Sequence, residues 1–245
     1  MEWIDTKKEG YKFFKIDVNE QIPDFEWAFY TAKRKTLYTI DTWQLRTYYK
    51  RFTNIFLGDL AKNLFKSFII NQRPEYEKNI IEYDRIRTDD FKSNDRFDLK
   101  ILNNDKEFNI EVKSSAEKIS RNVADLLKRR IIINFGNQHQ HFEWAVVQVM
   151  FVPKNLNFFK NENFSYENFE KFIKQYRKEF EENQVTAYIV GYADEEMQRK
   201  AVQKSLFSVK NSSASANERK YADLKIDEAN SLNKFIDELD NIFRN

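Results

Sequence analysis

The sequence predicts an α/β protein with one mixed β-sheet flanked by helices, and three patterns support this prediction. Alternating apolar and polar residues on both sides of Asn104 predict a β-hairpin within 96–115. Two nearly continuous apolar runs, 144–152 and 185–192, are typical of strands buried on both faces. Apolar residues at four-residue spacing within 41–70 predict a long amphipathic helix ahead of the strands.

The elements before the hairpin follow from their boundary residues. Pro23 and Asp24 mark the start of a first helix, with an apolar stretch directly behind them. The long helix over 41–70 cannot continue past Pro74, because proline lacks the backbone donor and clashes with the preceding turn. A strand is predicted over 80–87, immediately before the hairpin.

Behind the hairpin, helical and extended patterns alternate. A helix is predicted over 120–130, while 131–133 either extends that helix or forms an extra strand. The buried strand over 144–152 ends at Pro153, and an amphipathic helix is predicted over 165–182.

After the strand over 185–192, Asp194 is placed to cap a further helix. A loop over 211–216 then leads to a last helix that ends near Phe243. We therefore expect a single domain, residues 1–245, with its core at about 41–193, a helical N-terminal segment over 1–40, and a C-terminal loop and helices over 194–245.

Composition excludes several classes of function. The chain has 245 residues, 33% of them charged, and neither a long apolar run nor a signal peptide, so we expect a cytoplasmic protein without a membrane partner. The absence of cysteine excludes disulfides, Cys-ligated zinc and thiol catalysis. His139 and His141 have the H-x-H spacing of metal ligands, but they are also compatible with an ordinary loop.

Basic residues concentrate behind the hairpin, although the net charge of the chain is only +2. The stretch 113–130 holds six basic residues and two acidic ones. Such a cluster fits a nucleic-acid contact and equally fits a solvated helix face.

The register of the hairpin follows from its turn. With Asn104 and Asp105 at the centre, Asn103 pairs with Lys106 and each further pair steps outwards. A slip of one residue would scatter the apolar side chains, which this register gathers on one face. They are Phe97, Leu99, Ile101, Phe108, Ile110 and Val112.

The polar face of the same hairpin brings two carboxylates together. Asp98 lies directly opposite Glu111, where like charges destabilise a sheet. A divalent cation with oxygen ligands would relieve the repulsion, and Lys113 on the same face would relieve it less completely. A metal site and a plain salt-bridged sheet face both remain open at this point.

Asp98 followed after twelve residues by Glu111-Val112-Lys113 resembles the signature of the PD-(D/E)XK nuclease superfamily, the fold of many type II restriction endonucleases. The resemblance covers about 55–192 and includes the element order. It implies a restriction-endonuclease-like core in the order α-β-β-β-α-β.

The sequence departs from the family pattern at two places. Phe97 stands where members often have proline, and Lys62 stands four residues after Gly58, where many members have glutamate. Asp59, on the same predicted helix, is the candidate that would replace this glutamate as a catalytic residue. Asp84 and Gln148 are further outside candidates.

The predicted chemistry is hydrolysis of a phosphodiester. A Mg²⁺ held by Asp98 and Glu111, with the Val112 carbonyl as a further ligand, would polarise the phosphate and lower the pKa of bound water. Mn²⁺ is expected to substitute for it. Lys113 would orient the attacking water or offset charge in the transition state.

These observations predict a Mg²⁺-dependent endonuclease that cuts double-stranded DNA, most directly a type II restriction enzyme. The alternatives are a repair or defence nuclease of the same fold and a catalytically inactive nucleic-acid-binding module. If the recognised site is palindromic, a homodimer is expected. The predicted DNA contacts are Arg121, Lys128, Arg129, Arg130, Lys210, Arg219 and Lys220.

Overall fold

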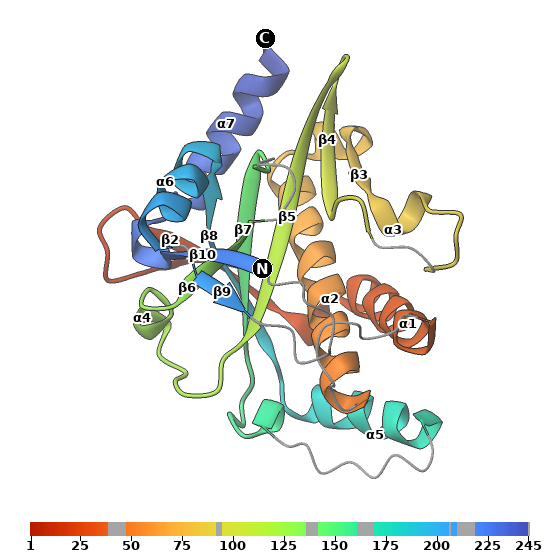
Figure 1. Cartoon of the computed structure of the whole chain (residues 1–245). Helices are drawn as coiled ribbons and strands as arrows, with labels where there is room; N and C mark the ends of the chain where they lie inside the picture. The colour runs from red at the N-terminus through yellow and green to blue at the C-terminus, as the bar shows by residue number, and fades with distance from the viewer. Residues whose placement is uncertain are drawn as a thin grey trace.

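The computed structural model in Figure 1 describes residues 1–38, 48–91, 95–135, 142–160, 169–205, 207–209 and 219–244. Its strands are β1 (Glu2–Asp5), β2 (Lys12–Asp17), β3 (Ile80–Glu82), β4 (Leu99–Asn103), β5 (Lys106–Ala116), β6 (Arg130–Phe135), β7 (Ala145–Val152), β8 (Thr186–Asp194), β9 (Phe207–Val209) and β10 (Arg219–Lys225). Its α-helices are α1 (Ile22–Tyr38), α2 (Tyr48–Gln72), α3 (Tyr83–Ile86), α4 (Val123–Leu126), α5 (Phe169–Glu182), α6 (Glu195–Ser205) and α7 (Leu232–Arg244). Short 3₁₀ helices are η1 (Val18–Glu20), η2 (Pro74–Asn79), η3 (Phe158–Lys160) and η4 (Ile226–Glu228).

A mixed seven-stranded sheet forms the centre of the fold, in the order β1-β2-β8-β7-β5-β4-β3. Strands β5 and β7 are parallel, and the other neighbours in this sheet are antiparallel. A second, three-stranded antiparallel sheet has the order β6-β10-β9. The prediction of an α/β fold with a mixed sheet flanked by helices is therefore confirmed.

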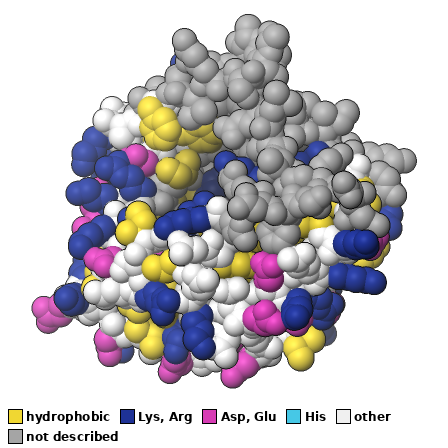
Figure 2. Space-filling model, turned by 90° about the horizontal axis from the view of Figure 1, so that it is seen from below, with side chains coloured by type: hydrophobic (Ala, Val, Ile, Leu, Met, Phe, Trp, Pro, Cys, Tyr) yellow, Lys and Arg dark blue, Asp and Glu magenta, His cyan; other side chains and the backbone are white. Residues whose placement is uncertain are grey.

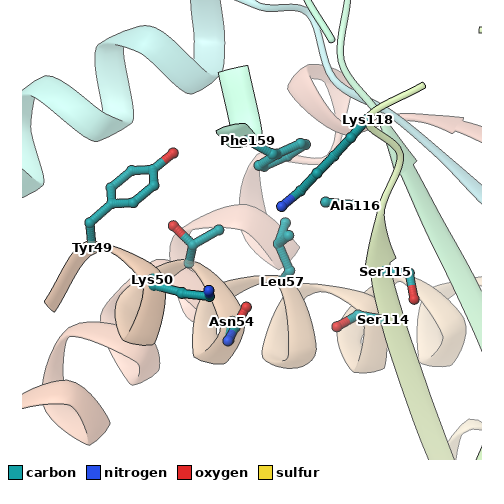
Figure 3. A pocket seen from close by; sticks show the side chains of 10 residues that line it. Tyr49, Lys50, Asn54, Leu57, Ser114, Ser115, Ala116, Lys118 and Phe159 are labelled. Atoms are coloured by element: carbon teal, nitrogen blue, oxygen red, sulfur yellow. The ribbon is translucent and has the colours of Figure 1, made fainter. Parts of the chain in front are cut away.

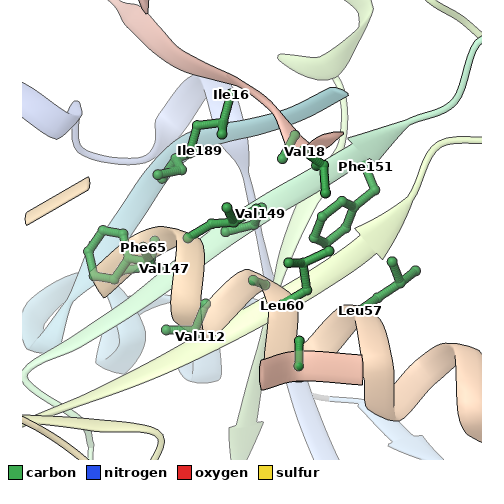
Figure 4. Close-up of a cluster of buried hydrophobic side chains, with 14 of the residues drawn as sticks. Ile16, Val18, Leu57, Leu60, Phe65, Val112, Val147, Val149, Phe151 and Ile189 are labelled. Atoms are coloured by element: carbon green, nitrogen blue, oxygen red, sulfur yellow. The ribbon is translucent and has the colours of Figure 1, made fainter. Parts of the chain in front are cut away.

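The central sheet is covered on both faces. Helices α1, α2, α5 and α7 pack on one face, and the small sheet with α4 and α6 packs on the other. The sequence of β7 is apolar apart from Gln148 because both of its faces are buried. Val147 and Val149 face α2, whereas Val146 and Met150 face the small sheet. Figure 4 shows Val149 of β7 beside Leu60 of α2 within the larger cluster.

Helix α2 is built around the four-residue apolar spacing. The five residues of that spacing have no exposed surface: Phe52, Phe56, Leu60, Leu64 and Phe68. Within the described residues the helix begins at Tyr48, and Pro74 follows it at the start of η2, as predicted. No helix in the described part of the chain is both long and apolar enough to cross a bilayer.

The predicted helical N-terminal segment is wrong for its first 17 residues. These form β1 and β2, which extend the central sheet beyond β8. Strand β2 is buried on both faces, with Phe13 in the cluster under the small sheet and Phe14 in the cluster under α2. The segment behind Asp194 likewise contains strands β9 and β10 besides the predicted helices.

Two further predictions of local structure are wrong in part. The strand predicted over 80–87 stops at Glu82, where the chain turns into α3 and so buries Asp84. The helix predicted over 120–130 is reduced to the single turn α4, and 131–133 belongs to strand β6. The predicted loop over 211–216 lies outside the described residues.

Predictions at the other boundaries are confirmed. The side chain of Asp194 accepts a hydrogen bond from the Met197 backbone at 2.9 Å and so caps α6. Helices α5 and α7 lie within the predicted ranges, and β8 covers the second apolar run.

Gly191 in β8 is a backbone position that requires glycine. Its φ is +144°, and a Cβ there would lie 2.2 Å from the Tyr11 hydroxyl and 2.8 Å from the Asn230 carbonyl oxygen. We expect Gly191→Ala to lower the free energy of unfolding by about 2 kcal/mol, measured by urea denaturation. Gly58→Ala is the control, because a Cβ at this helical position meets no atom within 4 Å.

Candidate active site

The hairpin that carries the predicted motif forms in the predicted register as far as Leu99 and Ile110, but the predicted strand pairs Asp98–Glu111 and Phe97–Val112 do not form. Asn103 pairs with Lys106, Ile101 with Phe108 and Leu99 with Ile110. Asn104 takes a φ of +53°, which asparagine tolerates in tight turns.

Phe97 departs from the predicted apolar face, because β4 begins only at Leu99. Its ring packs edge-on against Tyr83, and the Lys100 ammonium lies over it. Strand pairing with β5 therefore does not include Asp98, and Phe97 contributes nothing to the core under α2.

The two edges of β5 are paired over different lengths. We call the place where the pairing with β4 ends the fork; its residues are Asp98, Glu111 and Lys113. Strand β4 pairs with one edge of β5 only as far as Ile110, whereas β7 pairs with the opposite edge from Ile110 to Ala116. Beyond the fork the Asp98 side chain takes the place of a strand neighbour, since its Oδ2 accepts a hydrogen bond from the Val112 backbone N–H at 2.8 Å. The fork thereby fixes Asp98 beside the strand that carries Glu111.

Glu111 and Lys113 lie on the partly open face of β5. Each side chain retains about a quarter of its exposure, and the Lys113 ammonium donates to Glu111 Oε1. Burial and the nearby Glu111 carboxylate raise the pKa of Asp98 to about 6, although the Lys62 ammonium acts in the opposite direction. The structure thus brings together the three residues of the predicted motif.

The donor set at the fork fits a hard divalent cation. Among the described residues, neither Asp98 Oδ1 nor Glu111 Oε2 has a hydrogen-bond partner, so each carboxylate keeps one oxygen for a ligand. Mg²⁺ needs only one or two protein carboxylates, because water fills its other positions. No larger cluster of three or more His, Cys, Asp or Glu suited to a metal occurs in the described part of the chain.

A buried ion network lies behind the fork. Lys62 contacts Asp84 and donates to Asp59 Oδ1 at 3.3 Å, while Lys35 donates to both carboxylates at 2.8 Å. Thr31 donates to the other Asp59 oxygen at 2.9 Å. Burial would lower the pKa of Lys62, but the surrounding carboxylates outweigh it and raise that pKa. The network therefore keeps Lys62 protonated, with its ammonium close enough to Asp98 to act on that carboxyl.

The position of Asp59 bears on its predicted catalytic role. Both of its oxygens are already occupied within the network, so it has no free oxygen turned to a ligand. Its catalytic role remains a prediction. The network also includes Asp84 and reaches Asp95, which accepts from Lys35 at 3.1 Å and so anchors the chain just before Asp98.

The raised pKa of Asp98 predicts a pH-dependent stability. Between about pH 4 and pH 6 the folded protein keeps a proton that the unfolded chain has released, so stability falls as pH rises through this window. We expect Asp98→Asn in EDTA to be more stable than the natural protein by about 1–3 kcal/mol at pH 8, and the difference to vanish near pH 4.

Urea denaturation at a series of pH values measures this difference. Asp105→Asn, in the exposed hairpin turn, is the control for the removal of one carboxylate. A stability difference for Asp98→Asn that does not change between pH 4 and pH 8 would contradict a raised pKa of Asp98 in the folded protein.

The predicted DNA contacts are dispersed in the structure. Three of them pair with carboxylates of the same chain: Lys128 with Asp125, Arg129 with Glu117, and Arg130 with Asp223. Arg121 is exposed and makes no ion pair within the described residues, and Lys220 is exposed on β10. Arg219 lies on β10, but its side chain, like Lys210, His139 and His141, lies outside the described residues.

Gln148, the polar residue within β7, is buried and donates to Ser115 Oγ at 3.2 Å and to the Val149 carbonyl at 3.0 Å. These contacts give it a structural role.

The motif alone did not predict a polar pocket whose lining includes the residues directly after the motif. The pocket has a volume of about 320 Å³ and lies between the first half of α2 and the end of β5. In Figure 3, Lys118 reaches from the end of β5 toward α2, where Lys50 and Asn54 lie. Ser114 and Ser115, directly after the motif, line the same pocket. In the sequence, these two hydroxyl residues were the signal from which the pocket could have been predicted.

Comparison with known proteins found no relative of this chain. No protein-family model, curated protein or solved structure matches this chain. The function must therefore be argued from the geometry of the fork, the ion network and the pocket.

Proposed function

We propose that the protein is a Mg²⁺-dependent endonuclease that hydrolyses phosphodiester bonds of double-stranded DNA, in the manner of a type II restriction enzyme. The observation that carries the proposal is the fork, where Asp98 and Glu111 each have one oxygen without a partner among the described residues and Lys113 lies against Glu111. A purely structural sheet face would have no need for two adjacent carboxylates with unused acceptors.

Each residue of the fork has a distinct task in this proposal. Asp98 and Glu111 would bind Mg²⁺, or Mn²⁺ in its place, together with the backbone carbonyl of Val112. The cation supplies Lewis acidity toward the phosphate and a lowered pKa of bound water. Lys113 positions the attacking water and offsets the negative charge that develops on the phosphate oxygens. The Val112 N–H holds Asp98 in place through its hydrogen bond to Oδ2.

The polar pocket supports a substrate with more than one phosphate. Ser114 and Ser115 follow Lys113 along β5, Lys118 lies in the loop directly behind this strand, and Lys50 faces them from α2. Hydroxyl and ammonium donors of this kind bind phosphate oxygens and fix the register of a nucleic-acid strand. A palindromic target would further require a homodimer.

A cleavage assay tests the proposal. Unmethylated plasmid and phage DNA are incubated with the protein in Mg²⁺, in Mn²⁺ and in EDTA, beside Glu111→Gln. Glu107→Gln is the matched control, because Glu107 lies on the same strand with its side chain 59% exposed and pairs with Lys100, away from the fork. We expect discrete fragments in either metal from the natural protein and the control, and none from Glu111→Gln.

Other outcomes separate the alternatives. A smear in place of discrete fragments would favour a repair or defence nuclease without sequence specificity. Intact DNA under every condition, together with no heat of Mg²⁺ binding in calorimetry, would contradict the nuclease proposal.

An inactive nucleic-acid-binding module is the second candidate, and one observation favours it. Lys62 stands where the family has a catalytic glutamate, and Asp59, its possible replacement, is fully engaged by Lys35, Lys62 and Thr31. DNA binding in a gel-shift assay without cleavage in either metal would be the signature of this function.

A further inference from the structure

The loop between β5 and α4, residues 117–122, is held in a fixed shape. Glu117 has only 2% of its surface exposed, and its Oε1 accepts the backbone N–H groups of Lys118, Ile119 and Ser120 at 3.0, 2.7 and 3.2 Å. Arg129 clamps the same carboxylate with two hydrogen bonds of 2.7 and 2.9 Å. The buried Glu117 carboxylate therefore fixes the backbone conformation of the loop.

The second half of the loop is also tied down. Ser120 donates from its hydroxyl to Asp125 at 2.7 Å, and the Asn122 side chain caps α4 by accepting from the Ala124 N–H at 3.0 Å. The loop leaves the lower end of β5 in Figure 1 and projects away from the sheet. A loop ordered in advance loses little conformational entropy on binding.

This rigid loop presents an apolar side chain to solvent. Ile119 is 75% exposed, and among the large hydrophobic residues that the structure describes it is the most exposed. Lys118 and Arg121 flank it, are themselves exposed, and make no ion pair within the described residues. Figure 2, which views this end of the molecule, shows basic side chains spread over the surface with acidic ones between them.

The loop lies at a distance from the fork that suits a DNA groove. Strand β5 continues for three residues beyond Lys113 and ends at Ala116, which corresponds to about 10 Å. Since each base pair rises by about 3.4 Å, the loop begins about three base pairs from a phosphate held at Lys113. Restriction sites are short, so this distance falls within or next to the recognised sequence.

We propose that the 117–122 loop is a sequence-reading element that enters a groove of the DNA substrate. In this proposal, which rests on the proposed nuclease function, Ile119 makes an apolar contact with base edges such as the thymine methyl group. Lys118 and Arg121 contact phosphates on the two sides of the groove. Glu117 and Arg129 act as positioning residues that keep the loop in shape.

Binding measurements in the cleavage-deficient Glu111→Gln background test the proposal. Fluorescence anisotropy gives the affinity for a 30-base-pair duplex that contains the cut site mapped with the natural protein. We expect Ile119→Ala to weaken binding about 5- to 30-fold with an unchanged salt dependence. Arg121→Ala should weaken binding to all sequences and reduce the slope of log K against log salt by about one.

The matched control is Ile22→Ala, because Ile22 is 63% exposed at the start of α1 and far along the chain from the loop. A second readout is the set of sequences cut by Ile119→Ala in the otherwise natural protein, which should become broader. Circular dichroism and the oligomeric state of each variant confirm that the fold is intact.

The outcomes separate this inference from the proposed function. Unchanged affinity and unchanged cleavage specificity of Ile119→Ala would overturn the inference and leave the nuclease intact. A changed oligomeric state with unchanged affinity would also overturn it, because Ile119 would then cover a second copy of the chain. If the natural protein produces no cut site at all, both proposals are overturned.

Discussion

Replacing Lys113 by alanine is expected to reduce Mg²⁺-dependent DNA cleavage by about 10²–10³-fold, the loss typical of removing one group that stabilises developing charge. The same change should alter the free energy of unfolding by less than about 1 kcal/mol. The reason is that Lys113 and Glu111 are each about a quarter exposed, so their ion pair is well solvated. Initial cleavage rates and urea denaturation measure the two effects.

Lys100→Ala provides the control for this prediction. Lys100 lies on the same hairpin and pairs with the exposed Glu107, but it is not part of the fork. A cleavage rate of Lys113→Ala within tenfold of the natural rate would exclude Lys113 from the chemistry and would favour a role in neutralising Glu111.

Replacing Lys62 by methionine is expected to lower the free energy of unfolding by about 3–5 kcal/mol, because it removes one of the two ammonium groups that neutralise the buried carboxylates Asp59 and Asp84. Lys62 contacts Asp84 and Asp59, which are 1% and 8% exposed at their side chains, so water cannot replace the ammonium. Methionine keeps the apolar stem, and the loss therefore reports on the charge. Urea denaturation of both proteins measures it.

Two further variants give this prediction its controls. Lys66→Met, one turn further along α2, should cost much less, because Lys66 is 20% exposed and lies 3.8 Å from a carboxylate that Arg85 also contacts. The double variant Lys62→Met with Asp84→Asn should recover part of the lost stability. Equal losses for Lys62→Met and Lys66→Met would show that the network contributes little.

Local patterns predicted the hairpin and the buried strands well, because their information lies in adjacent residues. The Asn104-Asp105 turn set the register from Leu99 to Ile110, and the apolar run of β7 reflected burial on both faces. The predicted helix over 120–130 failed for the opposite reason. Glu117 captures the N–H groups of the preceding loop, and its partner Arg129 lies twelve residues away.

Long-range assembly accounts for most of what was missed. Strand β10 pairs with β6 although about 90 residues separate Asp223 from Ile132, and no local pattern encodes such pairing. Asp98, Glu111 and Lys113 could be assembled from a single hairpin. The ion network could not be, because its lysines and carboxylates come from α1, α2 and α3.

The two outermost strands of the central sheet limit how copies of this chain can associate. Strand β1 has four residues with Glu2 and Asp5 at its ends, and β3 has three residues. Short edge strands with charged side chains offer few unpaired backbone groups to an incoming strand, and they are a common protection against aggregation. If the protein acts as a pair on a symmetric target, its two sheets should remain separate, and helices or loops should form the contact.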